Sequence, residues 1–183
     1  MPRLIAFLRA INVGGHVVTM EKLRGIFETL GFSGVETFIA SGNVIFSSRA
    51  NPETLVPKIE HRLHQALGYE VRTFLRTGAE VAAVAGYKPF EDRQLQSAKA
   101  LNVGFLHQPL GAAGVTAVMA LKPGIDDFHV HGREIYWLCR TKQSESKVSN
   151  AVFERALRVP VTFRGLNTIH RLVARYDLSP AGN

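Results

Sequence analysis

The sequence predicts an α+β fold made of two ferredoxin-like units in tandem, each with the order βαββαβ and with its helices packed on one face of an antiparallel sheet. Two observations lead to this prediction. A pair of strand patterns meets at a glycine turn in each half of the chain, and each pair is followed by a helical pattern and a further strand pattern. The expected units are residues 1–77 and 92–183, joined by a helix and linker at 78–91, and an extra helix closes the second unit.

The first half supplies the elements of one unit in order. The apolar run RLIAFLRAI is typical of a buried strand, and the amphipathic helix MEKLRGIFETLG follows with Thr19 as its cap. Two strand patterns flank Gly42 and Asn43, which predicts a hairpin. Asn51 and Pro52 are expected to break the chain, and in the helix that follows Pro57 fits the first turn if Thr54 is the cap. The run YEVRTFLRT completes the unit as a strand.

The second half repeats this order after an alanine-rich helix, GAEVAAVAGY, and a break at Pro89. A strand pattern, KALNVGFLH, precedes the run AAGVTAVMAL, which we interpret as a helix although its valines would also suit a strand. A hairpin is expected at Gly132, and the helix SKVSNAVFERALR and the strand VPVTFRG follow. No repeat is visible residue by residue, so the predicted duplication depends on the order of the elements.

Composition limits the classes of protein that fit. A chain of 183 residues with 46% hydrophobic residues is not a disordered chain. It contains no apolar run of about 18 residues, so we expect no membrane span and a cytoplasmic location. Its single cysteine, Cys139, is expected to be a packed residue. His129 and His131 alternate on one strand face without further ligands, so the sequence predicts no metal and no cofactor.

Positive charge is concentrated in one late segment. The net charge is +7, and residues 140–175 alone hold eight lysines and arginines against two glutamates. Such a segment favours an anionic partner, a nucleotide or nucleic acid, although a basic surface also increases solubility.

A glycine pair, Gly14 and Gly15, stands between the first strand and the first helix. It matches neither the dinucleotide fingerprint nor the P-loop. Two interpretations stay open: the glycines only allow a turn with positive φ, or they join Asn12 and His16 in an anion site at the start of the helix.

The polar stretch RTKQSESKVSN, residues 140–150, leads into a later helix. Ser144 or Ser146 is expected to cap that helix, which would place Lys147 in its first turn. A lysine there opposes the helix dipole, and this suggests a compensating anion. Arg164 and Asn167 stand at the start of the last helix and would supply further donors.

Several segments resemble the bacterial family catalogued as domain of unknown function 1697. They are LRAINVGG, MEKLRGIFETLGF, VETFIASGNVIFSS, GREIYWL, SESKVSNAVFERAL and RGLNTIHRL, in this order between Leu4 and Val173. The resemblance implies two ferredoxin-like halves. It implies no activity, cofactor or catalytic residue.

Three functional hypotheses follow. The first is a module that binds a phosphate-bearing ligand, a nucleotide or RNA, through Arg9, Asn12, Gly14, Gly15, Ser146, Lys147, Arg164 and Asn167. For RNA, Phe7 or Phe46 would stack on bases. The second is a small enzyme acting on a phosphorylated substrate, with His16 or His170 as acid or base. The third is a protein-interaction module. The sequence leaves the ligand, any reaction and the oligomeric state open.

Overall fold

Two four-stranded antiparallel sheets form the framework of the molecule. The structure is a computed structural model that describes residues 1–12, 14–40, 42–121, 126–142, 145–146 and 148–180. The strand orders are β2-β3-β1-β4 and β6-β7-β5-β8, so each sheet has the ferredoxin-like order, and the described residues also form seven helices. The predicted fold class is confirmed.

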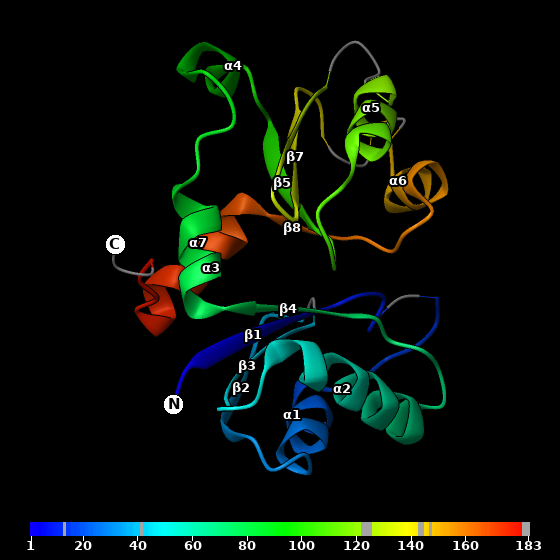
Figure 1. Cartoon of the computed structure of the whole chain (residues 1–183), viewed down its shortest axis with the longest axis vertical. Coiled ribbons are helices and arrows are strands. Elements are labelled where there is room, and N and C mark those ends of the chain that lie inside the picture. Colours follow the sequence, from blue (N-terminus) through cyan, green and yellow to red (C-terminus); the bar gives the residue numbers. More distant parts are fainter. Residues whose placement is uncertain (13, 41, 122–125, 143–144, 147, 181–183) are drawn as a thin grey trace. The chain divides into compact units, whose positions relative to one another are not determined.

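The first sheet carries two helices on one face (Figure 1). Its elements are β1 (Arg3–Leu8), α1 (Met20–Glu28), β2 (Ser33–Phe38), β3 (Asn43–Ser47), α2 (Pro52–Leu67) and β4 (Thr73–Thr77). Strand side chains alternate between faces, so Leu4, Ala6 and Leu8 of β1 join the helix residues Leu23 and Phe27 in one buried core. Burial of these apolar side chains is the main force that holds the helices on the sheet.

Of the two helix caps in this unit, one was predicted correctly and the other was not. Thr19 caps α1, as predicted, because its Oγ1 accepts a hydrogen bond from the N–H of Lys22 at 3.1 Å. Thr54 does not cap α2: Asn51 does, with its Oδ1 accepting from the N–H of Glu53 at 2.9 Å. Asparagine followed by proline is a favoured helix start, whereas the prediction treated this pair only as a break. Pro57 therefore lies in the second turn.

The second sheet also carries two helices on one face (Figure 1). Its elements are β5 (Ala100–Phe105), α5 (Ala112–Ala120), β6 (Asp127–His131), β7 (Glu134–Cys139), α6 (Asn150–Leu157) and β8 (Thr162–Gly165). The run whose type was open, AAGVTAVMAL, forms helix α5. Trp137 and Phe163 pack on Phe153 with ring centroids 5.7 and 4.8 Å away, and Cys139 lies fully buried in the same core.

Helix α6 begins later than the sequence analysis expected. Its cap is Ser149, whose Oγ accepts a hydrogen bond from the N–H of Val152 at 3.4 Å. The prediction that Ser144 or Ser146 is the cap is therefore wrong. Ser144 and Lys147 lie outside the described residues, and Ser146 has another partner, given below. Because the helix starts at Asn150, the argument from the helix dipole no longer applies to Lys147.

Both predicted hairpins are present. Strands β2 and β3 pair antiparallel, as do β6 and β7, and Gly42 and Gly132 have positive φ at the two connections. At Gly42 a side chain would also collide with Ile11, whose Cγ2 would lie 2.6 Å from an added Cβ. Glycine is thus required there for two reasons, backbone conformation and close packing.

Three helices lie outside the two βαββαβ patterns: α3 (Gly78–Gly86), α4 (Asp92–Gln96) and α7 (Leu166–Tyr176). By their contacts, Met1–Ala83 and Leu172–Asn183 form one compact unit, and Val84–Arg171 form the other. Helix α7 therefore begins in the second unit and ends in the first. The bounds proposed from the sequence, 1–77, 78–91 and 92–183, stay a prediction. In the described part of the chain, no helix has the length and apolar character needed to cross a membrane.

The end of α7 is fastened to the first unit by polar contacts. The Arg3 guanidinium donates to the carbonyl of Tyr176, and the Tyr176 hydroxyl donates to Glu36 at 3.1 Å. Leu178 then packs close to Gly78, where an added Cβ would lie 3.1 Å from Cδ2 of the leucine. The segment after Leu172 is thus a structural part of the first unit.

Candidate functional sites

The loop that contains the glycine pair is shaped by Asn12. The Oδ1 of Asn12 accepts a hydrogen bond from the N–H of Val18 at 2.7 Å, and its Nδ2 donates to the carbonyl of Ala40 at 3.1 Å. Gly14 and Gly15 are exposed, have φ of +63° and +86°, and would meet nothing within 4 Å if a Cβ were added. The glycines therefore serve the backbone conformation of a turn, and Asn12 holds that turn in place.

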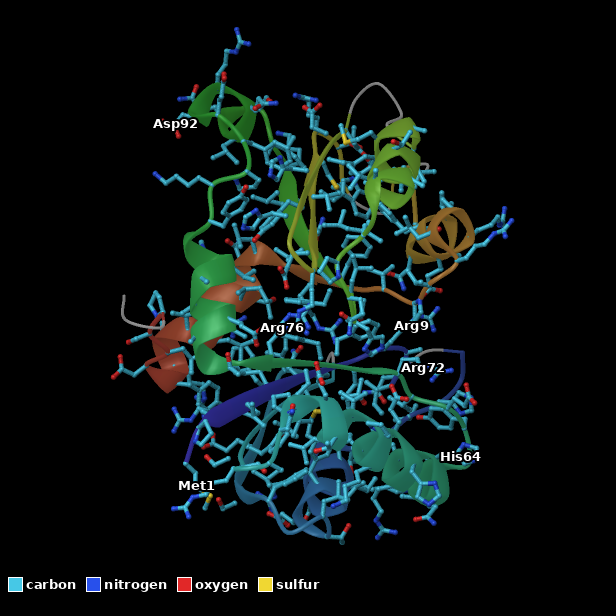
Figure 2. All side chains as sticks on the ribbon, viewed as in Figure 1. Met1, Arg9, His64, Arg72, Arg76 and Asp92 are labelled. Atoms are coloured by element: carbon cyan, nitrogen blue, oxygen red, sulfur yellow. The ribbon has the colours of Figure 1, made fainter. Side chains whose placement is uncertain are left out.

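Tyr69 closes the same loop from the end of α2. Its ring stacks on His16 with centroids 3.9 Å apart, and its hydroxyl donates to the carbonyl of Ile11 at 3.0 Å. Burial raises the pKa of Tyr69 above its usual value. The N–H of Arg9 donates to the carbonyl of Arg72 at 2.9 Å, and Figure 2 labels both side chains. Arg9, Asn12, Gly14 and Gly15 thus belong to one loop of the first unit.

The predicted residues of the second unit have separate surroundings. Arg164 is 8% exposed, its Nη1 donates to Thr162 Oγ1 and to the carbonyl of Phe163, both at 2.9 Å, and burial lowers its pKa to about 10. Asn167 is exposed on the first turn of α7. His170 places Nε2 3.0 Å from the carbonyl oxygen of Ala85. Convergence of these residues on one anion stays a prediction.

Ser146 contacts a buried carboxylate instead of capping a helix. Its hydroxyl donates to Asp126 Oδ2 at 2.7 Å, and the indole N–H of Trp137 donates to the same oxygen at 3.0 Å. Asp126 is fully buried, and its Oδ1 has no hydrogen-bond partner. Burial, and then the charge of Asp126, raise the pKa of Cys139 to about 12, so this thiol stays protonated at neutral pH.

The phenylalanines proposed to stack on RNA bases are in fact core residues. Phe7 and Phe46 are 0% exposed. Phe46 packs between Phe27 and Phe32, with ring centroids 5.6 and 4.3 Å away, on the side of the sheet that the helices cover. The hypothesis that either ring offers an exposed stacking surface is therefore wrong.

A hollow of about 470 Å³ in the second unit was not expected from the sequence. It is lined by Glu91, Arg93, Gln94, Ser97 and Arg140. The Arg140 guanidinium is held in place, because Nη2 donates to Asp127 Oδ2 at 2.6 Å and Nε donates to Ser97 Oγ at 3.3 Å. The Asp127 side chain is only 11% exposed, so this ion pair is well shielded from water. The hollow thus presents two guanidinium groups, one of them firmly positioned.

The segment that forms this hollow is attached along β6. The Tyr87 hydroxyl lies 2.9 Å from His129 Nε2, and the Tyr87 ring stacks on His131 with centroids 4.1 Å apart. Further along, Gln94 Nε2 donates to Asp127 at 3.5 Å. Burial, and then the charge of His131, lower the pKa of His129. Alternate residues of β6 therefore hold residues 87–97 over one face of the strand.

A second hollow, of about 290 Å³, lies in the first unit. Its polar lining comes from α2 and from the residues before β4: Glu60, His61, His64, Glu70 and Arg72. Arg72 forms ion pairs with Glu60 at 3.2 Å and with Glu70 at 3.6 Å. Both histidines are exposed. Among the described residues, no group of three or more His, Cys, Asp or Glu side chains could hold a metal ion.

Of the residues that line the hollow in the second unit, one lies in the basic segment that the sequence singles out. Arg140 begins this segment, residues 140–175, whereas Arg93 and Ser97 stand before the first strand of the expected second unit, where no functional residue was predicted. The local signal was present: Glu91 and Gln94 form a capping box, which marks a helix start within EDRQLQS. The contact between this helix and Arg140 joins residues far apart in the chain, and no spacing rule predicts it.

Comparisons with known proteins support this fold and name no ligand. The conserved bacterial protein SP0830 from Streptococcus pneumoniae is similar to this chain with a TM-score of 0.72 and 26% identity, over 93% of this chain and 96% of that one. No curated protein matches the sequence. The family model described as "Protein of unknown function (DUF1697)" matches residues 1–136, about three quarters of the chain. The chain therefore belongs to the DUF1697 family of proteins of unknown function.

Proposed function

We propose that the protein binds a phosphate-bearing ligand, a nucleotide or RNA, in the hollow lined by Arg93 and Arg140. The observation that carries the proposal is the pair of guanidinium groups on one hollow, of which Arg140 is held by the shielded carboxylate of Asp127. Guanidinium groups match the geometry of phosphate oxygens and bind them through paired hydrogen bonds.

Pre-organisation strengthens this argument. A long arginine side chain loses rotamer freedom when it binds a ligand, and that loss opposes affinity. Asp127 and Ser97 already restrict the Arg140 side chain, so less freedom is lost on binding. Gln94 adds a side-chain amide to the lining, and an amide N–H can donate to a phosphate oxygen.

The charge of the wider segment supports the same class of ligand. Residues 140–175 carry an excess of six positive charges, which attracts anions over distances up to about 10 Å at 0.1 M salt. Arg9, Asn12, Gly14 and Gly15, with Ser146, Lys147, Arg164 and Asn167, remain proposed contacts for the same kind of ligand. Their variants form a separate arm of the test, with Lys147→Ala as the first.

The test is a calorimetric titration of the protein with inorganic pyrophosphate and with a short RNA. The titration is repeated at several salt concentrations. Arg93 is exposed, so Arg93→Ala should leave the fold intact and weaken binding by about 1–3 kcal/mol. Arg155→Ala, an exposed arginine on α6, removes the same charge away from the hollow and serves as the control. Equal effects of the two variants, or no binding to either probe, would overturn the proposal.

A further inference from the structure

The structure points to a base-binding platform beside the arginine hollow: the stacked rings of Tyr87 and His131. We infer that the hollow and the platform together bind a short stretch of single-stranded nucleic acid. This inference rests on the proposed function, because the hollow must first bind phosphate. It adds the class of ligand and the residues that would contact its bases.

One ring of the stack, Tyr87, is ordered by further contacts, and the other, His131, is exposed. The rings of Tyr87 and His131 are nearly parallel, at 14°, with centroids 4.1 Å apart. Tyr87 is fixed from two further directions, by its hydroxyl against His129 Nε2 at 2.9 Å and by the ring of Tyr136 at 5.2 Å. His131 itself is exposed at the end of β6. A base can therefore extend the stack on His131 without rearrangement of Tyr87.

Platform and hollow are joined by one rigid strand. His131 ends β6, and Asp127, which positions Arg140 in the hollow, begins it. Four residues of extended strand span about 13 Å at roughly 3.3 Å per residue. A base and its own phosphate lie closer together than this. A ligand that contacts both places must therefore be longer than a nucleoside monophosphate.

The chemistry of the two places matches single-stranded nucleic acid. Proteins bind such strands with aromatic side chains that stack on bases and with cations that follow the phosphates. Stacking on a ring face tolerates every base, so we expect little sequence preference. The described segment 87–97 contributes to both places, with Tyr87 at one end and Ser97 at the other.

The experiment compares three labelled hexamers of equal length by fluorescence anisotropy: RNA, DNA and an abasic backbone of the same charge. Inorganic pyrophosphate is titrated alongside them. The unmodified protein should bind the RNA hexamer, the DNA hexamer or both at least about fivefold more tightly than the abasic strand, since stacking adds roughly 1 kcal/mol or more per base. The preferred hexamer identifies the type of sugar in the ligand.

Three variants sharpen the comparison. His131→Ala should remove the advantage over the abasic strand while leaving pyrophosphate binding unchanged. His131→Phe should restore the advantage, because phenylalanine also offers a stacking face. His61→Ala removes an exposed histidine from the first unit and should change nothing.

The outcomes separate this inference from the function on which it rests. The inferred base-binding platform is contradicted if the hexamers and the abasic strand bind equally tightly. It is also contradicted if His131→Ala weakens binding of the abasic strand as much as binding of RNA. Neither result contradicts the proposed phosphate site. A mononucleotide that binds as tightly as the hexamer also overturns it. Failure of every probe, pyrophosphate included, overturns both.

Discussion

The edge strands β2 and β6 hold the same position in two sheets of the same strand order, yet different chemistry covers them. On β2, the covering residue is Tyr176 from the end of α7. Its hydroxyl donates to Glu36, its ring packs edge-on against Phe38 with centroids 6.3 Å apart, and Arg175 forms an ion pair with Glu36 at 3.7 Å. This ion pair is exposed, with side chains 60% and 53% accessible.

On β6, the covering residue is Tyr87 from the segment that follows α3. Its partners are the imidazoles of His129 and His131, and the accompanying ion pair, Arg140 with Asp127, is largely shielded. Each edge strand is thus covered by a tyrosine from outside the βαββαβ pattern, Tyr176 on β2 and Tyr87 on β6. The comparison teaches that the topology demands a cover for each edge strand but leaves its chemistry open. Among the described residues, the cover of β6 includes an exposed ring, that of His131, and lies beside a hollow.

The largest expected difference between the units lies in their cores. Phe46→Ala and Trp137→Ala each remove a buried ring and should lower the free energy of unfolding by about 3–5 kcal/mol. Trp137→Ala should cost about 1–3 kcal/mol more, because Asp126 then loses an indole donor at a fully buried site. Urea unfolding, with hydrogen exchange to locate the loss, measures both. A larger loss from Phe46→Ala would contradict this prediction.

The next largest difference is expected in how much each ion pair contributes to stability. Arg140→Gln leaves the shielded carboxylate of Asp127 without its guanidinium partner and should cost about 2 kcal/mol of stability. Arg175→Gln breaks an exposed pair and should cost less than about 1 kcal/mol. The double variant Arg140→Gln with Asp127→Asn should regain part of the loss in a denaturant titration. If both single variants lower the free energy of unfolding by the same small amount, shielding from water does not make the two ion pairs differ in strength.

The two tyrosine hydroxyls should then prove similar. Tyr87→Phe keeps the stack on His131 and loses the contact with His129, while Tyr176→Phe keeps the contact with Phe38 and loses the bond to Glu36. Each should cost about 0.5–1.5 kcal/mol. Hydrogen exchange should rise at residues 87–97 for the first variant and at 172–178 for the second. Faster exchange at both segments in either variant would show that the covers are coupled.

The smallest effect should be a dependence on pH that only the cover of β6 shows. Burial lowers the pKa of His129 below its usual value of 6.5, so the unfolded chain binds a proton more readily than the folded one. The stabilising contribution of neutral His129 is therefore complete above pH 6.5 and is lost as the pH falls through 6.5 toward the lowered pKa. Protection from exchange, corrected for the intrinsic pH dependence of amide exchange, should fall at residues 87–97 on acidification, whereas protection at 172–178 should not follow it. His129→Asn should flatten this response.

Local patterns were sufficient to predict the fold. Glycine turns at Gly42 and Gly132 identified two hairpins, and helical spacing identified the helices between them, because both signals arise from neighbouring residues. Errors occurred where two local rules competed. Asn51 and Pro52 start α2 although they were interpreted as a break, and Ser149 was preceded by other serines that would also suit a cap.

The candidate site was less accessible to sequence analysis for a physical reason. Tyr87 and Arg93 acquire their roles from contacts with β6 and Arg140, and such contacts depend on the tertiary fold rather than on spacing. His129 and His131 were noticed as a pair on one strand face. Their partner was a tyrosine from another segment, which the pattern of the strand itself does not reveal.

The first unit consists of two segments that are far apart in the sequence, and this has a consequence during protein synthesis. Residues up to Ala83 leave the ribosome early, whereas the segment from Leu172, with Tyr176 and Leu178, emerges only after residues 84–171. At about 5–20 residues per second, this interval lasts roughly 4 to 18 s. During it the edge of β2 lacks its tyrosine and is open to pairing with other nascent chains. The unit whose synthesis begins first is therefore the last to be completed.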